Sequence, residues 1–266
     1  MSQIKILFLG DIVGKIGRKA VIKELPKLKK KYKPDFIIAN AENLAHGVGI
    51  TEKTLAEMMD AGINFFTSGN HIWKNAEAEK IFSENTLPIV RPANYPDGVL
   101  GDGYKIVEVG KSKILIANLI GRVFMRENFD CPFRKLEQIL KETKNERIDF
   151  KIVDFHAEAT SEKIAFGKYF DGKVDLVLGT HTHVQTADEK IFKKGTGFIC
   201  DAGMVGAMDS SIGVDFKNVI DMFLTQISKT FEIPEKGTCI INGVFAIIKQ
   251  EKGVSCIERV NQENEV

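Results

Sequence analysis

Two histidines separated by one residue, in the stretch Thr180-His181-Thr182-His183, are the side chains of this sequence best suited to chemistry. They follow residues 174–179, whose apolar run ending in glycine predicts a buried strand. Histidines at positions i and i+2 after such a strand both lie at the rim of the sheet, where imidazole can bind a metal ion or transfer a proton. Two solvated loop histidines would fit this stretch equally well, so its interpretation depends on the rest of the chain.

Metal-competent or titratable side chains also follow four other predicted strands. Considered alone, each has an ordinary structural explanation as a turn residue, a surface charge or a core imidazole. Four of the five histidines nevertheless stand at these strand ends, and ligands of open α/β sheets bind at the carboxyl ends of strands. We therefore expect one site. Its members are Asp11, Glu42, Asn43, Asn70, His71, His156, His181 and His183.

Oxygen and imidazole donors without thiolates suit manganese, iron or zinc. The donors outnumber the three or four that one ion needs, so two ions about 3.5 to 4 Å apart, bridged by one carboxylate, would use them all. Glu42 is the expected bridge because it carries two oxygens and follows a central strand. The four cysteines are widely spaced and lack a Cys-x-x-Cys pattern, so neither a zinc ribbon nor a disulfide framework is predicted.

Strands and helices that alternate along the first third of the chain would position these residues. Apolar runs at 4–9, 35–41 and 63–68 predict strands. Helical spacing at 14–32 and 52–61 predicts helices, although Pro26 could kink or shorten the first; Thr51 is a candidate N-cap for the second. This alternation favours βαβ units in a mostly parallel sheet.

Later in the chain, the regular alternation of strands and helices gives way to a hairpin and less regular segments. Residues 104–109 and 113–118 predict an antiparallel hairpin, and the segment 121–131 resists assignment. Further strands are predicted at 150–155, 175–178, 195–201 and 239–250, and further helices at 132–144, 160–170 and 217–230. Parallel units followed by hairpins favour an α/β fold with two packed sheets and helices outside.

Length and charge bound the function. The 266 residues contain no repeat or linker and predict one domain spanning 1–266, with a polar, frayed tail at 261–266. The N-terminal apolar run is too short for a membrane span, so we expect a cytoplasmic protein without membrane contact. With a net charge of +1, the chain lacks the excess of basic residues that binds duplex nucleic acid, so we expect no such binding. The sequence leaves open whether the protein forms a homo-oligomer.

Three short motifs together resemble those of the calcineurin-like metallophosphoesterases: Gly10-Asp11, Gly69-Asn70-His71 and Thr180-His-Thr-His183, with His156 before the third. Two departures distinguish this chain. The superfamily has Asp-x-His where residues 11–13 are Asp-Ile-Val, and it usually has Gly-Asp where residues 41–43 are Ala-Glu-Asn. Together with residues 201–206 (DAGMVG), these departures resemble the YmdB-like subfamily of bacterial 2',3'-cyclic nucleotide 2'-phosphodiesterases, over almost the whole chain.

The resemblance implies a four-layer α/β/β/α sandwich and a dinuclear, metal-dependent phosphodiesterase with iron or manganese. One ion would be held by Asp11, Glu42, Asn43 and His183, and the other by Glu42, Asn70, His156 and His181, with Asn43 compensating for the missing histidine. Two cations that share a solvent ligand lower its pKa, so a metal-bound hydroxide would attack phosphorus. His71 would be the proton donor to the leaving oxygen.

Substrate contacts are predicted from two loops. His46 and Gly47 lie beside Glu42 in a glycine-rich loop, while Met204 and Asp209 belong to the segment 203–213, which could instead form a subunit contact. Two other functions remain open: an RNA-processing nuclease, and a regulatory metal-binding protein with incidental phosphodiesterase activity. Near-neutral charge and few aromatic residues disfavour the nuclease, and a proton donor at His71 has no purpose in a pure metal-binding module.

Overall fold

The computed structural model describes residues 3–266, and within this range the strands form two mixed sheets. The first sheet has the order β12-β11-β10-β1-β2-β3 and the second the order β4-β5-β6-β7-β9-β8. The strands of the first sheet are β1 (Gln3–Ile12), β2 (Phe36–Asn40), β3 (Phe65–Thr67), β10 (Met204–Ala207), β11 (Thr238–Lys249) and β12 (Gly253–Glu265). Those of the second are β4 (Tyr104–Val109), β5 (Ser112–Ile120), β6 (Phe150–His156), β7 (Leu176–Thr180), β8 (Lys190–Ile191) and β9 (Gly197–Ile199).

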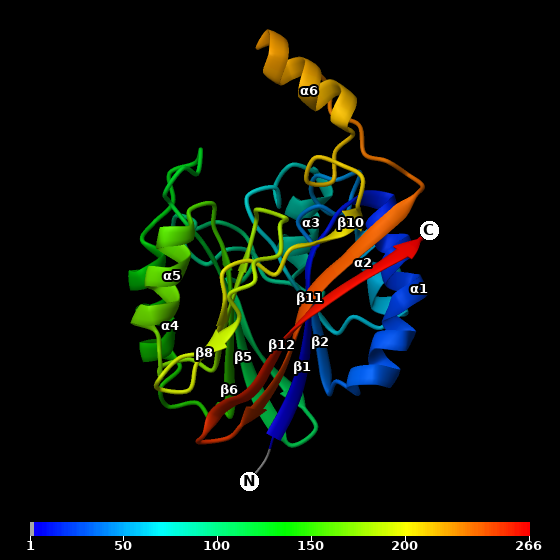
Figure 1. Ribbon diagram of the computed structural model, residues 1–266. Helices are drawn as coiled ribbons and strands as arrows, with labels where there is room; N and C mark the ends of the chain where they lie inside the picture. Colours follow the sequence, from blue (N-terminus) through cyan, green and yellow to red (C-terminus); the bar gives the residue numbers. More distant parts are fainter. Residues whose placement is uncertain (1–2) are drawn as a thin grey trace.

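The helices lie outside the two sheets, apart from one that projects from the body (Figure 1). They are α1 (Gly14–Tyr32), α2 (Glu52–Ala61), α3 (Glu77–Glu84), α4 (Pro132–Glu142), α5 (Thr160–Tyr169) and α6 (Phe216–Thr225). Figure 1 shows α1 and α2 on one side of the molecule, α4 and α5 on the other, and α6 extending away at the top. No helix within residues 3–266 is long and apolar enough to cross a membrane.

The alternation of side chains along β1 explains the layers. Ile6 and Phe8 belong to the core between the two sheets, together with residues of β5, β6 and β7. Leu7 and Leu9 face the opposite way, into the core beneath α1 and α2. A third core packs β6 against α4 and α5, with Phe155 and Phe166 at its centre. Three apolar layers separate four layers of structure, so the expected α/β/β/α sandwich is confirmed.

Local predictions are confirmed where the sequence carries a strong signal. The hairpin forms, with Tyr104 paired antiparallel to Ala117 and Val109 to Ser112. The second helix begins after Thr51, whose hydroxyl accepts a hydrogen bond from the Thr54 backbone N–H at 3.1 Å. The first helix runs unbroken from Gly14 to Tyr32, with Pro26 on its exposed face.

Three predictions need correction. The tail is not frayed: residues 261–265 belong to β12, where Asn261 pairs with Asn242 and Glu265 with Thr238. Backbone hydrogen bonds to β11 hold this segment in the sheet. Its polar composition gave no sign of a strand. The helix predicted at 217–230 ends at Thr225, because Gln226 has a left-handed backbone with φ of 60°. Helix α3 and strands β8, β10 and β12 were not predicted.

Candidate metal centre

Both sheets direct polar strand ends toward one place. The first sheet supplies Asp11 from β1 and, from the loops after β2 and β3, Glu42, Asn43, Asn70 and His71. The second sheet supplies His156 at the end of β6, and His181 and His183 after β7. The structure therefore brings together all eight site residues expected from the sequence. Their role as metal ligands and proton donor stays a prediction.

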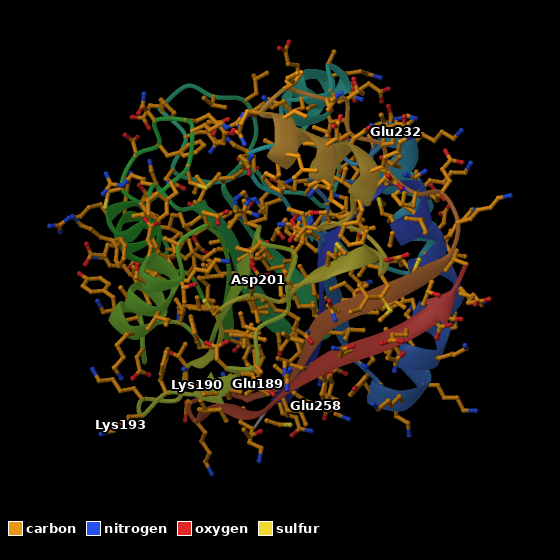
Figure 2. All side chains as sticks on the ribbon, turned by 45° about the horizontal axis from the view of Figure 1, so that its top comes forward. Glu189, Lys190, Lys193, Asp201, Glu232 and Glu258 are labelled. Atoms are coloured by element: carbon orange, nitrogen blue, oxygen red, sulfur yellow. The ribbon has the colours of Figure 1, made fainter. Side chains whose placement is uncertain are left out.

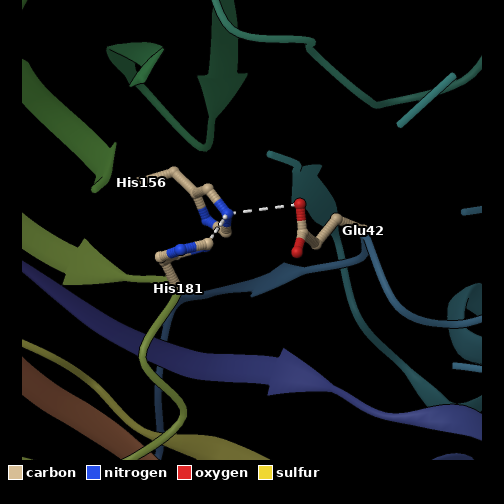
Figure 3. Close-up of side chains that lie close together, drawn as sticks. All are labelled: Glu42, His156 and His181. Carbon is tan, nitrogen blue, oxygen red and sulfur yellow. Dashed lines mark hydrogen bonds and ion pairs between the residues drawn. The ribbon is translucent and has the colours of Figure 1, made fainter. Parts of the chain in front are cut away.

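One group of donors consists of Glu42, His156 and His181, shown in Figure 3. His156 Nε2 lies 3.2 Å from Glu42 Oε2 and 3.0 Å from Nδ1 of His181. The side-chain oxygen of Asn70 lies 3.1 Å from the same His156 nitrogen. Two imidazole nitrogens that face each other with a carboxylate beside them need a hydrogen atom or a cation between them.

A second group consists of Asp11, Glu42 and His183, so Glu42 belongs to both groups. His183 Nε2 lies 3.8 Å from Asp11 Oδ1. Asp11 is fully buried, and its Oδ1 has no hydrogen-bond partner among residues 3–266. A buried, unpaired carboxylate oxygen is costly, and a bound cation removes that cost.

The second nitrogen of each candidate ligand histidine has an acceptor. His156 Nδ1 donates to Thr180 Oγ1 at 2.9 Å, and this hydroxyl donates to Asp154 Oδ1 at 2.7 Å. His183 Nδ1 donates to the Ile212 carbonyl at 2.8 Å. These contacts leave Nε2 of His156 and His183 free to bind an ion as neutral imidazole.

His181 is oriented the other way round. Its Nε2 lies 3.0 Å from Glu158 Oε2, so Nδ1 is the nitrogen that faces His156 and Glu42. Metal-binding histidines almost always donate their other ring N–H to a carboxylate, carbonyl or water. The partners Thr180, Glu158 and Ile212 were not predicted from the sequence, because no local pattern marks a hydrogen-bond acceptor that lies behind a ligand.

The charges in the cluster favour a proton on His156 and a neutral His181. Burial alone would lower the pKa of His156, but the carboxylates of Glu42 and Asp11 outweigh it and raise this pKa to about 9. Burial and the nearby His156 lower the pKa of His181 to about 3. Burial also raises the pKa of Asp154, to about 6. A metal ion would therefore displace the proton on His156.

The two carboxylates of the cluster differ. Burial raises the pKa of Asp11, although the nearby His183 and His156 act to lower it. Burial would also raise the pKa of Glu42, but His156 and His71 reverse the effect and hold it well below its usual range. Glu42 accordingly accepts from the His71 backbone N–H at 3.0 Å. Glu42 is the better anion of the two, as suits a carboxylate shared by both groups.

The amide of Asn43 lies with its nitrogen toward the cluster. Its Nδ2 is 3.1 Å from Glu42 Oε1 and 3.1 Å from His183 Nε2, whereas its Oδ1 is 2.8 Å from His71 Nδ1. A metal ion requires the oxygen there. With the amide oxygen turned toward the cluster, Asn43 could bind an ion, and His71 Nδ1 would keep Glu42 Oε1, 3.2 Å away, as its acceptor.

Gly69 permits the close approach of the two sheets at this point. A Cβ at Gly69 would overlap Glu42 Oε2 and His156 Nε2, so a side chain at this position would fill the space between the donors. Below the site, Asp154 accepts a hydrogen bond from Asn40 Nδ2 at 3.0 Å and another from Thr67 Oγ1, which joins the second sheet to the first. The donors are therefore held on fixed strand ends.

The histidine loop after β7 has an unusual backbone. His181 and His183 have φ values of 101° and 65°, a region that costs free energy for residues with side chains. Asp201 holds the loop: its Oδ2 accepts from the Thr182 backbone N–H at 3.1 Å and from the Thr182 hydroxyl at 2.8 Å. Figure 2 shows Asp201 in the interior, and Lys163 Nζ lies 2.7 Å from the same oxygen. Sequence reasoning assigned no role to this buried ion pair.

A cavity of about 550 Å³ opens above the donors. His46 and Gly47 line it, as the sequence led us to expect, together with Asn43, His71 and His181. The other two predicted substrate contacts, Met204 and Asp209, do not line this cavity. Met204 is buried in β10 and lines a neighbouring cavity, and Asp209 is exposed and is absent from the lining of the cavity above the donors.

The residues present fit a metal centre. Imidazole, carboxylate and amide donors converge, one buried carboxylate oxygen lacks a partner in residues 3–266, and the far nitrogens of the histidines are already occupied. The four cysteines of the chain are free thiols and none belongs to either group of donors. The donor set suits ions that accept nitrogen and oxygen ligands.

Comparison with known proteins identifies relatives over nearly the whole chain. The family model described as "YmdB-like protein" matches residues 7–260. A Bacillus subtilis protein named 2',3'-cyclic-nucleotide 2'-phosphodiesterase is 43% identical over 257 residues, covering 97% of this chain and 96% of the relative. The crystal structure of a novel phosphatase from Mycoplasma pneumoniae has a TM-score of 0.92 at 38% identity, covering 100% of this chain and 95% of that one.

A hypothetical protein from Thermus thermophilus gives a similar result. Its crystal structure has a TM-score of 0.91 at 35% identity and covers 98% of this chain and 100% of that one. The shared fold, the coverage of both partners and the family match agree. This chain belongs to the YmdB-like protein family.

Proposed function

We propose that this protein is a metal-dependent phosphodiesterase that hydrolyses 2',3'-cyclic nucleotides with two ions, iron or manganese. The observation that carries the proposal is the arrangement of two donor groups that share Glu42 beside His71, under one cavity. The name and the 43% identity of the Bacillus subtilis relative support the same substrate class. The reaction would break the bond between phosphorus and the ribose 2' oxygen, and leave a 3'-monophosphate.

Eight positions divide between binding and proton transfer. Asp11, Glu42, Asn43 and His183 would hold one ion, and Glu42, Asn70, His156 and His181 the other. When bound, two such ions polarise phosphoryl oxygens and acidify water. The chain's own contribution is to fix the donors on strand ends and to keep three imidazoles neutral through Thr180, Glu158 and the Ile212 carbonyl.

His71 is the candidate proton donor. Its backbone N–H and its Nδ1 are both engaged, with Glu42 Oε2 at 3.0 Å and Glu42 Oε1 at 3.2 Å. Nε2 is the nitrogen left for a substrate in the cavity, which the half-buried His71 lines. A proton delivered from Nε2 to the departing 2' oxygen would prevent the build-up of negative charge on that oxygen.

A substrate panel tests the proposal. Protein purified without chelators, supplied with Mn²⁺ or Fe²⁺, is assayed on 2',3'-cyclic AMP, bis(p-nitrophenyl) phosphate and short RNA. We expect turnover of the cyclic nucleotide, release of adenosine 3'-monophosphate and no preference for RNA. A strong preference for RNA would favour a nuclease, and bound metal without turnover of any substrate would favour a regulatory metal-binding protein.

A further inference from the structure

One aromatic ring in the loop 121–130 stands in solvent at the mouth of the cavity above the donors. Phe124 is 83% exposed and lines this cavity together with Asn70 and His181. The same loop contains Phe129, which is 7% exposed and packs edge-on against Tyr95 with 5.0 Å between ring centroids. The loop thus buries one phenylalanine against the protein and presents the other to the cavity.

The loop is held in place at both ends. The amide of Asn94 donates to the Ile120 carbonyl at 2.8 Å and to the Asp130 carbonyl at 2.9 Å, which clamps the two stems together. The carboxylate of Glu162 accepts from the backbone N–H groups of residues 122 and 123, directly before Phe124. An anchored loop of this kind presents a side chain in a defined position.

The backbone at Phe124 is strained as well as exposed. Its φ of 64° lies in the left-handed region, which is costly for a bulky side chain. Exposure of the ring adds a further cost, because packing inside the described chain does not compensate for its contact with water. The strained backbone and the exposed ring both cost free energy. Because the ring lies beside a cavity with a polar floor, we infer that it contacts a ligand bound there.

A second ring and two cations complete the mouth. Phe231, which follows α6, is 48% exposed and lines the same cavity. Figure 1 shows the loop 121–130 at upper left and the residues after α6 at upper right, both above the strand ends. Lys74 and Arg126 also line the cavity, as do the acids Glu127 and Glu158. The cavity volume of about 550 Å³ lies within the range of small-molecule sites.

We propose that Phe124 is the stacking platform for the nucleobase of the substrate, with Phe231 as the second apolar wall. The inference rests on the proposed function, because the donors below would fix the cyclic phosphate and leave the base at the mouth. Every base has a π-face, so a stacking ring strengthens binding without selecting one base. The ring would favour nucleotides over phosphodiesters that lack a base.

The test compares two cyclic phosphodiesters on the manganese-loaded protein: 2',3'-cyclic AMP and glycerol 1,2-cyclic phosphate, which lacks a base. Phe124→Ala should raise KM for the nucleotide about tenfold and leave kcat/KM for the glycerol compound within about twofold. Phe124→Tyr should restore the low KM, and Phe124→Gly, which removes the ring and the strain together, should behave as Phe124→Ala. Phe223→Ala on α6, at an exposed ring outside the cavity lining described here, is the matched control.

Equal losses on both substrates in Phe124→Ala would assign the residue to loop structure and overturn the proposal, as would unchanged kinetics on both. If the wild-type protein turns over neither substrate, the proposed function fails and the stacking role is decided by binding. The affinities for adenosine 3'-monophosphate and glycerol 2-phosphate are then compared by calorimetry. A preference for the adenosine compound that disappears in Phe124→Ala supports the platform, and the absence of a preference in the wild type overturns it.

Discussion

The floor and the mouth of the cavity are built in opposite ways. The floor comprises the eight site residues and the groups behind them; most of its polar atoms are buried and, apart from Asp11 Oδ1, most have a partner. Asp154, Thr180 and His156 form one chain of hydrogen bonds, and Lys163 and Asp201 form a buried ion pair. The mouth lies in loops, and there Phe124 is 83% exposed.

This contrast indicates a division of work. Groups that must hold ions or place a proton need fixed geometry, which strand ends supported by further hydrogen bonds provide. Groups that contact the variable part of a substrate can lie on loops. Helix α6 continues the pattern of the mouth: it projects from the body (Figure 1), and its residues Phe223 and Leu224 are 67% and 80% exposed. Substitutions in the floor should therefore change metal binding and kcat, and substitutions in the mouth should change KM.

The largest effect is expected at the shared carboxylate. Glu42→Gln should weaken both ions together and reduce activity by about 1,000-fold or more, since a bound ion contributes several kcal/mol to charge stabilisation. Metal analysis after gel filtration measures the occupancy, with Glu258→Gln on β12 as a control outside the site. Full occupancy by two ions in the variant would contradict a bridging role for Glu42.

His71→Ala should reduce kcat by about 100- to 10,000-fold, the usual range for general-acid catalysis, while both ions stay bound. The deficit should shrink on bis(p-nitrophenyl) phosphate, because nitrophenolate is a good leaving group and needs no proton. Rates on the cyclic nucleotide and on this compound are measured side by side. Equal losses on the two substrates would remove His71 from proton transfer.

A smaller effect is expected behind the histidine loop. Asp201→Asn leaves the Lys163 ammonium buried without its counter-charge, which destabilises proteins by about 3 to 5 kcal/mol, and it weakens the hold on Thr182. Metal affinity should fall about 10- to 100-fold. Adding Lys163→Met should recover much of the stability in thermal unfolding but not the metal affinity. Recovery of both would show that Asp201 acts through stability alone.

The smallest effect concerns pH. With the pKa of His156 raised to about 9 in the metal-free chain, a proton occupies the site at neutral pH and an ion must displace it. The pKa of His181, lowered to about 3, adds no such proton. The affinity for Mn²⁺ should therefore rise about tenfold per pH unit between pH 7 and 8. One proton should be released for every two Mn²⁺ ions bound. Calorimetry in buffers of different ionisation enthalpy counts that proton, and an affinity independent of pH would refute the prediction.

Much of the fold follows from local patterns. Apolar runs identified β1, β2 and β6 to within a few positions, and Thr51 marked the start of α2. Strand β12 was not predicted because it is a polar edge strand. Its backbone is held by hydrogen bonds to β11, and side-chain burial contributes little. Helix α3 was not predicted because eight residues are too few for the spacing of apolar side chains to distinguish a helix from a loop.

The candidate site shows the same limit. Strand ends followed by Asp, Glu, Asn or His can be read from the sequence, and so can the absence of thiolate donors. The acceptors behind the histidines and the role of Asp201 could not be read, because they depend on contacts between residues far apart. Asp154 meets Asn40 across 114 positions, and Lys163 meets Asp201 across 38.

The sequence by itself determined the identity of the donor atoms and the strand ends that carry them, because periods of 2 and 3.6 residues are local properties of the chain. Only the tertiary structure decided which nitrogen of each histidine faces the cluster and which ring stands at the mouth. The packing of one sheet on the other sets these distances, and that packing depends on all the apolar side chains of the inner core together.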